Sequence, residues 1–581
     1  MKNHSHQSNH STSPQRSGGG GRPSEATAGR GPAHSTAPCL RREGLPKCVR
    51  SVGSLGDIHH ENPRRRGFVL AVVTISIVIL ALGAYNYTDT MLVAHEAAMM
   101  GGRDVVARTA AESAIQFAAT RVMERDLDPE INLFHDPTNF RGRLLVESSS
   151  PRSQVRFSIV AFDEANIDQG GIRFGLASEN SKFNLNQLLV LDQLEENVPE
   201  EERLGLAYMA LVNIPNMTDD VVDAILDWLD SDEDRRPGGA ESDYYEGLTV
   251  PYSCKNGAME SIDELLKIQG VTPELFYGED RNLNGLLDAG AGEDLNENGI
   301  LDLGWKDYLT ASSRERNSTP DGESKINLNM GEMTELYDAV EELFGEEAAS
   351  FIVAFRLAGT DYVEAGQPDT QSGIQDQISR NNIDLTIVPT YQFSSLYDLI
   401  AGETLPTKMI SGTDQSFVSP WSEDANTLLN VFPDLEQNLT ITDDAYIEGR
   451  ININQARREV LLSIPNITET APDDIIASRP ALEMTGGSST VMSRRNTAAW
   501  ILAEGIVDLP TLRAMGPYIT TGGDVYRFLA IGHYDEGGPT TRLEAMIDAT
   551  VYPPAIMSVR DLTKLGRGYH PSLLLDSDSG R

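Results

Sequence analysis

Cysteine is scarce in this chain of 581 residues, which contains three, and Cys254 is the only one after Cys48. No disulfide framework can therefore hold the body together, so its packed core must stabilise it, with metal ions as a further source of stability that the sequence leaves open. The sequence also lacks H-E-x-x-H, G-x-S-x-G and C-x-x-C motifs and a phosphate-loop lysine. Only four histidines beyond residue 60 are available as bases, and we predict that the protein is not an enzyme.

Positive charge is scarce after residue 67. Residues 1–67 carry 11 basic and 4 acidic side chains, whereas residues 68–581 carry 36 basic and 83 acidic ones. A body this acidic repels phosphate, so we expect neither nucleic acid nor anionic lipid as its partner. Acidic loops rich in oxygen ligands instead favour hard cations.

The chain has one long hydrophobic run, which is uncharged over residues 68–88. As a helix it would span roughly 30 Å, enough for the core of a bilayer. Three arginines directly before Gly67 predict a single-pass membrane anchor that leaves residues 1–67 in the cytoplasm and the acidic body on the other side. Residues 1–67 are either a disordered basic leader or the product of a misassigned start codon. The alternative is a cleaved signal, but the run is too long and no small-x-small cleavage site closes it.

The segments on either side of the central body predict an α+β fold. Residues 89–180 should continue the helix and then form strands, because residues 155–161 alternate in polarity and residues 171–178 resemble a hairpin partner. Residues 521–581 should hold a second hairpin, with residues 543–549 alternating and the turn at 535–539. The helix has one apolar face at spacings of three and four, which we expect to pack on this antiparallel sheet and to bind partners: Ala107, Ala111, Ile115, Ala118 and Val122.

The central body repeats itself. The segments KFNLNQL at 182–188, KINLNM at 325–330 and RININQA at 450–456 share one pattern, which defines units at residues 181–310, 311–445 and 446–520. Each unit is predicted to run strand, helix, turn, helix, with Asn186, Asn329 or Asn454 capping the first helix through its side chain. Residues 357–395 and 410–440 resemble insertions or linkers.

The repeated helical pair resembles the helix-hairpin-helix (SAM-like) module, which grips DNA phosphates through a glycine-containing turn. Here Asn216 and Asn466 occupy the glycine position. Because Asp219 and Asp220 adjoin the first turn, a phosphate would meet repulsion. We therefore interpret the units as packing modules, with a DNA-binding membrane protein of a competence or pilus-like system as the alternative.

An acidic stretch at residues 278–302 contains a loop that is repeated after fourteen residues. Alternate oxygen-bearing side chains followed by glycine suit a loop wrapped around Ca²⁺, although the usual Glu at position twelve is replaced by Ala291 and Trp305. The predicted calcium ligands are Asp280, Asn282, Asn284 and Asp288, then Asp294, Asn296, Asn298 and Asp302. A second cluster, which a solvated turn would also explain, is the fallback site: Asp227, Asp230, Asp232, Glu241 and Asp243.

The second cluster lies in a stretch with a specific family resemblance. Asp-Trp-x-Asp-x-Asp at 227–232, Pro-Gly-Gly-Ala-Glu at 237–241 and PYSCKNGAMESIDELLKIQGVTPELF at 251–276 resemble general secretion pathway protein K, a minor pseudopilin of type II secretion. The resemblance implies an inner-membrane protein with a pilin-like fold and a periplasmic body. It also implies calcium binding, and assembly at the pseudopilus tip with I- and J-type minor pseudopilins above the major pseudopilin shaft.

The same resemblance assigns the junction before the hydrophobic run. A prepilin peptidase would cut between Gly67 and Phe68, and Phe68 would then be methylated. Val72 stands at position five of the processed chain, where most pilin-like proteins have Glu, and its absence is characteristic of protein K. A carboxylate at this position would pair with the terminal amine of a neighbouring subunit, and a subunit that has no other subunit above it does not need that pairing. If the apolar helix face is the contact surface, Ile115→Asp should uncouple partners without unfolding the body.

Overall fold

The computed structural model describes residues 65–575 except 126–127, 129–130, 163–170, 196, 200–201, 289–291, 359–382, 384, 401–406, 411–412, 417–418 and 480–494. The leader up to residue 64, predicted to be disordered, lies outside the described residues. The remainder divides into a part that ends at Tyr85 and a body from Asn86 onward.

One unbroken helix, α1 (Arg65–Arg125), contains the hydrophobic run, as predicted. Its apolar stretch has a mean hydropathy of 2.6 and is not buried within the chain. Large apolar side chains from Phe68 to Met100 are exposed. A helix of this length and composition is compatible with a single-pass membrane anchor.

The body contains one large antiparallel sheet. Its main strands lie in the order β1 (Arg143–Val146), β2 (Val155–Phe162), β15 (Val525–Tyr534), β16 (Thr541–Asp548) and β17 (Ala555–Asp561). The predicted C-terminal hairpin is β15 and β16. The predicted partner of β2 divides in two, because β3 (Ile172–Arg173) pairs with β2 whereas β4 (Ala177–Ser178) pairs with β15.

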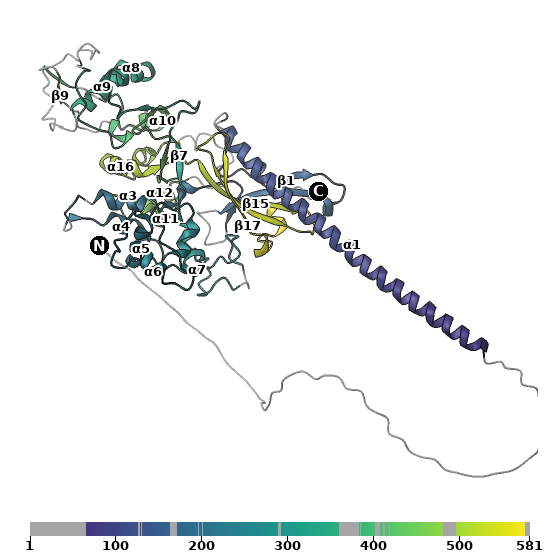
Figure 1. Ribbon diagram of the computed structural model, residues 1–581. Coiled ribbons are helices and arrows are strands. Elements are labelled where there is room, and N and C mark those ends of the chain that lie inside the picture. The colour runs from purple at the N-terminus through teal and green to yellow at the C-terminus, as the bar shows by residue number, and fades with distance from the viewer. Residues whose placement is uncertain are drawn as a thin grey trace, which may run out of the picture. The chain divides into compact units, whose positions relative to one another are not determined.

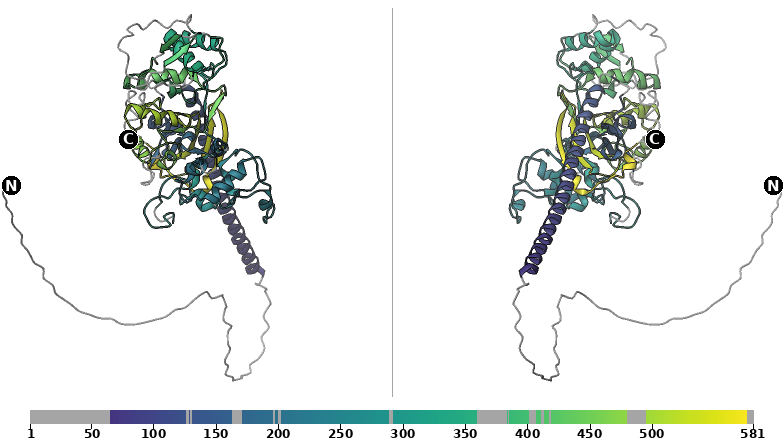
Figure 2. Two further views of the ribbon diagram at one scale, coloured as in Figure 1. Left: turned by 90° about the vertical axis from the view of Figure 1, so that its left-hand side faces the viewer. Right: turned by 90° about the vertical axis from the view of Figure 1, so that its right-hand side faces the viewer.

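The C-terminal half of α1 packs on this sheet, and the yellow C-terminal strands lie beside it in Figures 1 and 2. Gly532 of β15 permits the close approach, because a Cβ there would lie 1.9 Å from the carbonyl oxygen of Ala107. The α+β prediction of an N-terminal helix on an antiparallel sheet is thus confirmed.

The same packing corrects the predicted partner surface. All five residues of that face are buried against this chain's own sheet: Ala107, Ala111, Ile115, Ala118 and Val122. Apolar periodicity shows that a helix face is covered but not what covers it. The face is therefore not free to bind a partner, and Ile115→Asp is now expected to unfold the body by burying a charge.

Three helical units lie between β4 and β15 in the sequence. The first contains α3 (Gln187–Leu194), α4 (Leu206–Leu211), α5 (Asp219–Leu229), α6 (Ser242–Tyr245) and α7 (Pro273–Tyr277). The second contains α8 (Met333–Phe344), α9 (Glu346–Ala358) and α10 (Phe432–Asn438). The third contains α11 (Arg458–Leu461), α12 (Ala471–Ala477), α15 (Trp500–Ala503) and α16 (Leu509–Met515). That these are helix-hairpin-helix modules stays a prediction.

Each repeated segment begins with a two-residue strand that pairs in parallel with a strand 68 to 126 residues later in the sequence. The pairs are β5 (Phe183–Asn184) with β6 (Leu309–Thr310), β8 (Ile326–Asn327) with β11 (Leu439–Thr440), and β13 (Ile451–Asn452) with β14 (Ile519–Thr520). Each unit thus returns to its own starting strand. Antiparallel pairs β7 (Arg314–Arg316) with β12 (Tyr446–Glu448), and β9 (Thr407–Ile410) with β10 (Thr413–Ser416), complete the strands.

The second asparagine of each repeat does not cap a helix with its side chain, so that prediction is wrong, although Asn186 does stand at the N-cap position of α3. The Asn329 amide donates to the carbonyls of Phe393 (2.9 Å) and Ile441 (3.0 Å), and its oxygen accepts the Phe393 N–H (2.8 Å). Asn186 and Asn454 make equivalent links to the segment after the closing strand and to a second loop. These side chains bridge distant loops because the first asparagine of each repeat already bonds the local backbone.

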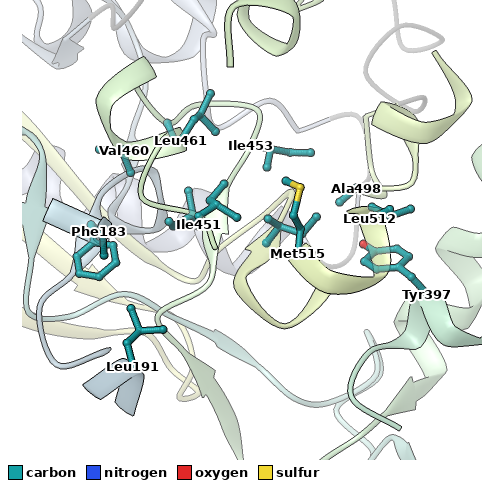
Figure 3. Close-up of a cluster of buried hydrophobic side chains, with 14 of the residues drawn as sticks. Phe183, Leu191, Tyr397, Ile451, Ile453, Val460, Leu461, Ala498, Leu512 and Met515 are labelled. Atoms are coloured by element: carbon teal, nitrogen blue, oxygen red, sulfur yellow. The ribbon is translucent and has the colours of Figure 1, made fainter. Parts of the chain in front are cut away.

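The three units share one hydrophobic core. Figure 3 shows Phe183 and Leu191 of the first unit and Tyr397 of the second around the third, represented by Ile451 and Met515. The short α2 (Pro137–Phe140) and α17 (Pro571–Leu574) pack instead with the core of the sheet.

Candidate metal centres

Three buried carboxylates converge in the first helical unit. Asp227 lies in α5, Asp230 directly follows it, and Glu241 directly precedes α6. One oxygen from each lies within 4.8 Å of the others. Gly239 lets the intervening loop fold closely over Asp227, since a Cβ at that position would overlap the Asp227 carboxylate. This explains why the Pro-Gly-Gly segment precedes Glu241.

Arg236 is the basic side chain that pairs with this cluster among the described residues. Its Nη1 lies 2.9 Å from Asp227 and 2.5 Å from Asp230, while Nη2 lies 3.0 Å from Asp192. Glu241, only 2% exposed, has no N–H or O–H donor on either oxygen and meets only the weak thiol donor of Cys254, and Asp230 Oδ1 has no donor. A buried carboxylate normally has a donor or a metal ion.

The electrostatics of the cluster favour a cation. Two like charges 4.8 Å apart repel by about 3 kcal/mol at an effective dielectric of about 20. Burial, reinforced by the charges of Asp227 and Asp230, raises the pKa of Glu241 to about 7. Burial also raises the pKa of Asp230, against the opposing effect of Arg236. The residues present therefore fit a divalent cation.

The fallback prediction is partly wrong. Asp232 and Asp243 are exposed and lie outside this cluster. Asp232 instead accepts the backbone N–H of Asp234 at 2.8 Å. Alternating acidic residues after a helix end point in different directions, so spacing alone does not show which of them converge.

The two acidic loops at residues 278–302 have the same internal geometry. In the first, Asp280 accepts the N–H groups of Asn284 (3.0 Å) and Gly285 (2.8 Å). The amides of Asn282 and Asn284 both donate to Asp288, at 2.6 and 3.0 Å. The second loop repeats each of these contacts through Asp294, Asn296, Asn298, Gly299 and Asp302. The eight predicted ligands are thus grouped as two sets of four.

Two glutamates that we did not predict join the loops to each other. Glu293 precedes the second loop but accepts the N–H of Asp288 in the first, at 3.1 Å. Glu279 precedes the first loop but accepts the N–H of Asp302 in the second, at 3.2 Å. Burial, with the charges of Asp288 and Asp280 adding to it, raises the pKa of Glu293. The repeated Gly-Glu-Asp at 278–280 and 292–294 is the sequence signal that identifies them.

The loops differ in their surroundings. Asp280 and Asn284 are fully buried, and Arg542 of β16 donates to the backbone carbonyls of Asn282 (3.0 Å) and Leu283 (2.5 Å). The Tyr569 hydroxyl donates to the Asn284 carbonyl at 2.7 Å. The second loop is mostly exposed. The first loop is therefore a fixed connection to the sheet, and the second is a surface loop.

Comparison with known proteins supports the family resemblance for part of the chain. Residues 181–277 match the family model of protein K of the type II secretion system. Type II secretion system protein K of Aeromonas hydrophila is 36% identical over 118 residues, which cover 19% of this chain and 36% of that protein. The protein of the same name from Pectobacterium carotovorum is 27% identical over 148 residues, covering 25% and 43%.

The matches leave out most of the relatives' length, because the chain spans 36% and 43% of these two curated relatives. A solved structure, the GspK-GspI-GspJ complex of the type 2 secretion system from enterotoxigenic Escherichia coli, aligns with 78% of this chain and 96% of its own. That alignment has 10% identity and a TM-score of 0.32. The resemblance to protein K predicted from residues 227–276 is confirmed by the matched region, which contains the Asp227–Asp230–Glu241 cluster.

Proposed function

We propose that this chain, whose residues 181–277 carry the domain of type II secretion protein K, is a minor pseudopilin at the tip of the secretion pseudopilus. It would initiate pseudopilus assembly and support export of folded proteins across the outer membrane. The match of the first helical unit carries the proposal. A structural rather than catalytic role agrees with the absence of catalytic motifs in the sequence.

The anchor has a defined place in this proposal. Residues 68–88 of α1 cross the inner membrane, with the N-terminus cytoplasmic and the body periplasmic. A prepilin peptidase removes the leader after Gly67, and Phe68 becomes the methylated N-terminus. The tip position is supported by a body of more than 400 residues, which would collide with a subunit stacked above it, and by Val72 in place of a pairing carboxylate.

The partners proposed are I- and J-type minor pseudopilins, with the major pseudopilin shaft below. Because the inner face of α1 is covered by the sheet, contacts must use other surfaces. The outer face of α1 near the exposed Val105 and the exposed edge strand β17 remain open within the described residues. Unpaired edge strands and exposed apolar side chains are common contact surfaces in assemblies.

Calcium is the proposed cofactor. The Asp227–Asp230–Glu241 cluster offers buried oxygens without donors, and the first acidic loop offers Asp280, Asn282, Asn284, Asp288 and Glu293. Bound calcium would supply the positive charge that these carboxylates lack. At a hundredfold excess over its dissociation constant it would add about 2.7 kcal/mol to the free energy of unfolding.

A melting experiment tests the cofactor. The full chain in detergent should melt at a higher temperature with calcium than with chelator. Glu241→Gln should remove the contribution of the cluster, and Asp288→Asn with Asp302→Asn that of the loops. Asp243→Asn, a matched change of an exposed neighbour, should leave the shift unaltered. Identical melting of the unaltered protein in calcium and chelator would refute calcium binding.

A genetic experiment tests the function. Deleting the gene should stop release of the system's secreted proteins and lower the number of pseudopili, and the unaltered gene should restore both. Immunogold labelling should find the protein at filament ends; even labelling along the shaft would exclude the tip position. A gel-shift assay with DNA at low salt tests the DNA-binding alternative. No shift is expected, because exposed Asp219 and Asp220 beside the first hairpin oppose phosphate binding.

A further inference from the structure

Arg236 occupies the position in the carboxylate cluster where a cation would be most favourable. We infer that its guanidinium competes with the divalent cation for Asp227 and Asp230 and so sets the affinity of the site. The inference rests on the calcium site proposed above. One nitrogen, Nη1, contacts both of these carboxylates, at 2.9 and 2.5 Å.

Charge explains why guanidinium and cation exclude each other. Three buried carboxylates face one guanidinium, so Arg236 neutralises only part of their charge and forms no ion pair with Glu241. A divalent cation bound to oxygens from all three would lie within contact range of the guanidinium. The repulsion between the two is strong in a buried setting. The favourable arrangement therefore has one or the other on Asp227 and Asp230.

Asp192 is an alternative carboxylate partner for the Arg236 side chain. It lies 3.0 Å from Nη2, and its side chain is 36% exposed, whereas that of Asp227 is fully buried. The Arg236 side chain is itself 23% exposed. Rotation toward Asp192 would release both carboxylates without stranding a buried charge. The arginine thus holds the cluster together at low cation concentration and yields to the cation at high concentration.

The loop does not depend on the side chain for its position. The backbone N–H of Arg236 donates to Asp227 (3.2 Å), and that of Gly238 donates to Asp223 (2.8 Å). Replacing the side chain by methionine keeps both bonds and most of the volume. Arg235, the preceding residue, is exposed and provides a control with the same change of net charge.

The test is calcium titration calorimetry of the full chain in detergent, with Asp288→Asn and Asp302→Asn present to silence the loops. Arg236→Met should bind calcium at least about tenfold more tightly and melt at a lower temperature without calcium. Arg235→Met should match the unaltered cluster. Asp192→Asn should weaken calcium binding several-fold, because the arginine then has no alternative carboxylate.

The outcomes separate this inference from the proposed site. Binding that Glu241→Gln abolishes establishes the site, whatever Arg236 does; if no such binding exists, both ideas are overturned. Equal or weaker binding by Arg236→Met overturns the competition alone and makes Arg236 a positioning residue. If Arg236→Met folds only with calcium, its release of calcium into chelator should be slower than in the unaltered protein, and equal or faster release refutes the inference.

Discussion

Gly532→Ala should separate α1 from the sheet. The added Cβ would lie 1.9 Å from the carbonyl oxygen of Ala107 and 2.8 Å from the backbone nitrogen of Ala111. Both are backbone atoms, so no change of rotamer relieves the overlap. An ordinary contact of roughly 3.5 Å requires the helix to retreat by about 1.5 Å from β15.

The cost follows from how tightly this seam is packed. Five alanines of α1 are fully buried against the sheet: Ala107, Ala110, Ala111, Ala114 and Ala118. Overpacking a close-packed core costs typically 1–3 kcal/mol, and a shift that also opens voids along the helix brings the expected loss to about 3 kcal/mol. For a body that runs from Asn86 to Arg581, the entropy of unfolding is about 1 kcal/mol/K, so this loss corresponds to a melting point lowered by roughly 3 °C.

Differential scanning calorimetry of the full chain in detergent measures this loss. Limited proteolysis should also reveal new cleavage in the C-terminal half of α1. Gly522→Ala is the control, because nothing lies within 4 Å of its added Cβ, and its midpoint should not move. A Gly532→Ala protein that melts with the unaltered one would refute the assignment of α1 to this sheet face.

Three further predictions concern other parts of the chain. Asn329→Ala removes three bridging hydrogen bonds and should destabilise the second unit by about 2–3 kcal/mol in urea unfolding, whereas Asn438→Ala, with one exposed bond, should cost less than about 1 kcal/mol. Burial lowers the pKa of His533 to about 4, with the charges of Arg156 and Arg567 adding to it. Because the unfolded chain binds this proton at a higher pH than the folded protein does, the free energy of unfolding should fall by up to about 3 kcal/mol as pH drops from about 6.5 to 4. His533→Gln should remove this part of the pH dependence of the free energy of unfolding, and an unchanged pH dependence would contradict the prediction. Gly67→Leu should leave the leader attached, whereas N-terminal sequencing of the unaltered membrane form should begin at Phe68; a mature chain that begins elsewhere would disprove the cleavage site.

Local periodicity predicted the parts of the fold that it governs. The helix, the alternation in β2 and the hairpin of β15 and β16 repeat their pattern over many residues, so each signal exceeds local noise. The closing strands of the units could not be found in this way, because Leu309–Thr310, Leu439–Thr440 and Ile519–Thr520 are two residues long. Their recurring apolar-Thr pair was visible only once the structure had placed it beside the Asn-x-Asn segments.

In the candidate sites, too, contacts within one short segment could be predicted from the sequence, whereas contacts between distant segments could not. Loop repetition located Asp280 and its partners, because each loop's contacts are made within nine residues. Glu293 serves a loop that precedes it, and Glu241 meets Asp227 across a glycine turn. Such partners depend on how the chain folds back, which spacing does not encode. The apolar spacing of α1 likewise predicts that the sheet packs on this face, but spacing does not show that the sheet covers the face completely and leaves none of it for a partner.

Because β4 pairs with β15, all three helical units form one continuous insertion between two neighbouring strands of the sheet. Ser178 lies opposite Tyr526, so the chain leaves the sheet and re-enters it at adjacent positions. A shortened protein with a tight turn in place of residues 179–524 would keep every strand pair of the large sheet. Each unit is likewise closed by its own strand pair, and could be gained or lost without altering the sheet's register. The sheet and its helix therefore form a base whose strand pairing does not depend on the number or the length of the helical units.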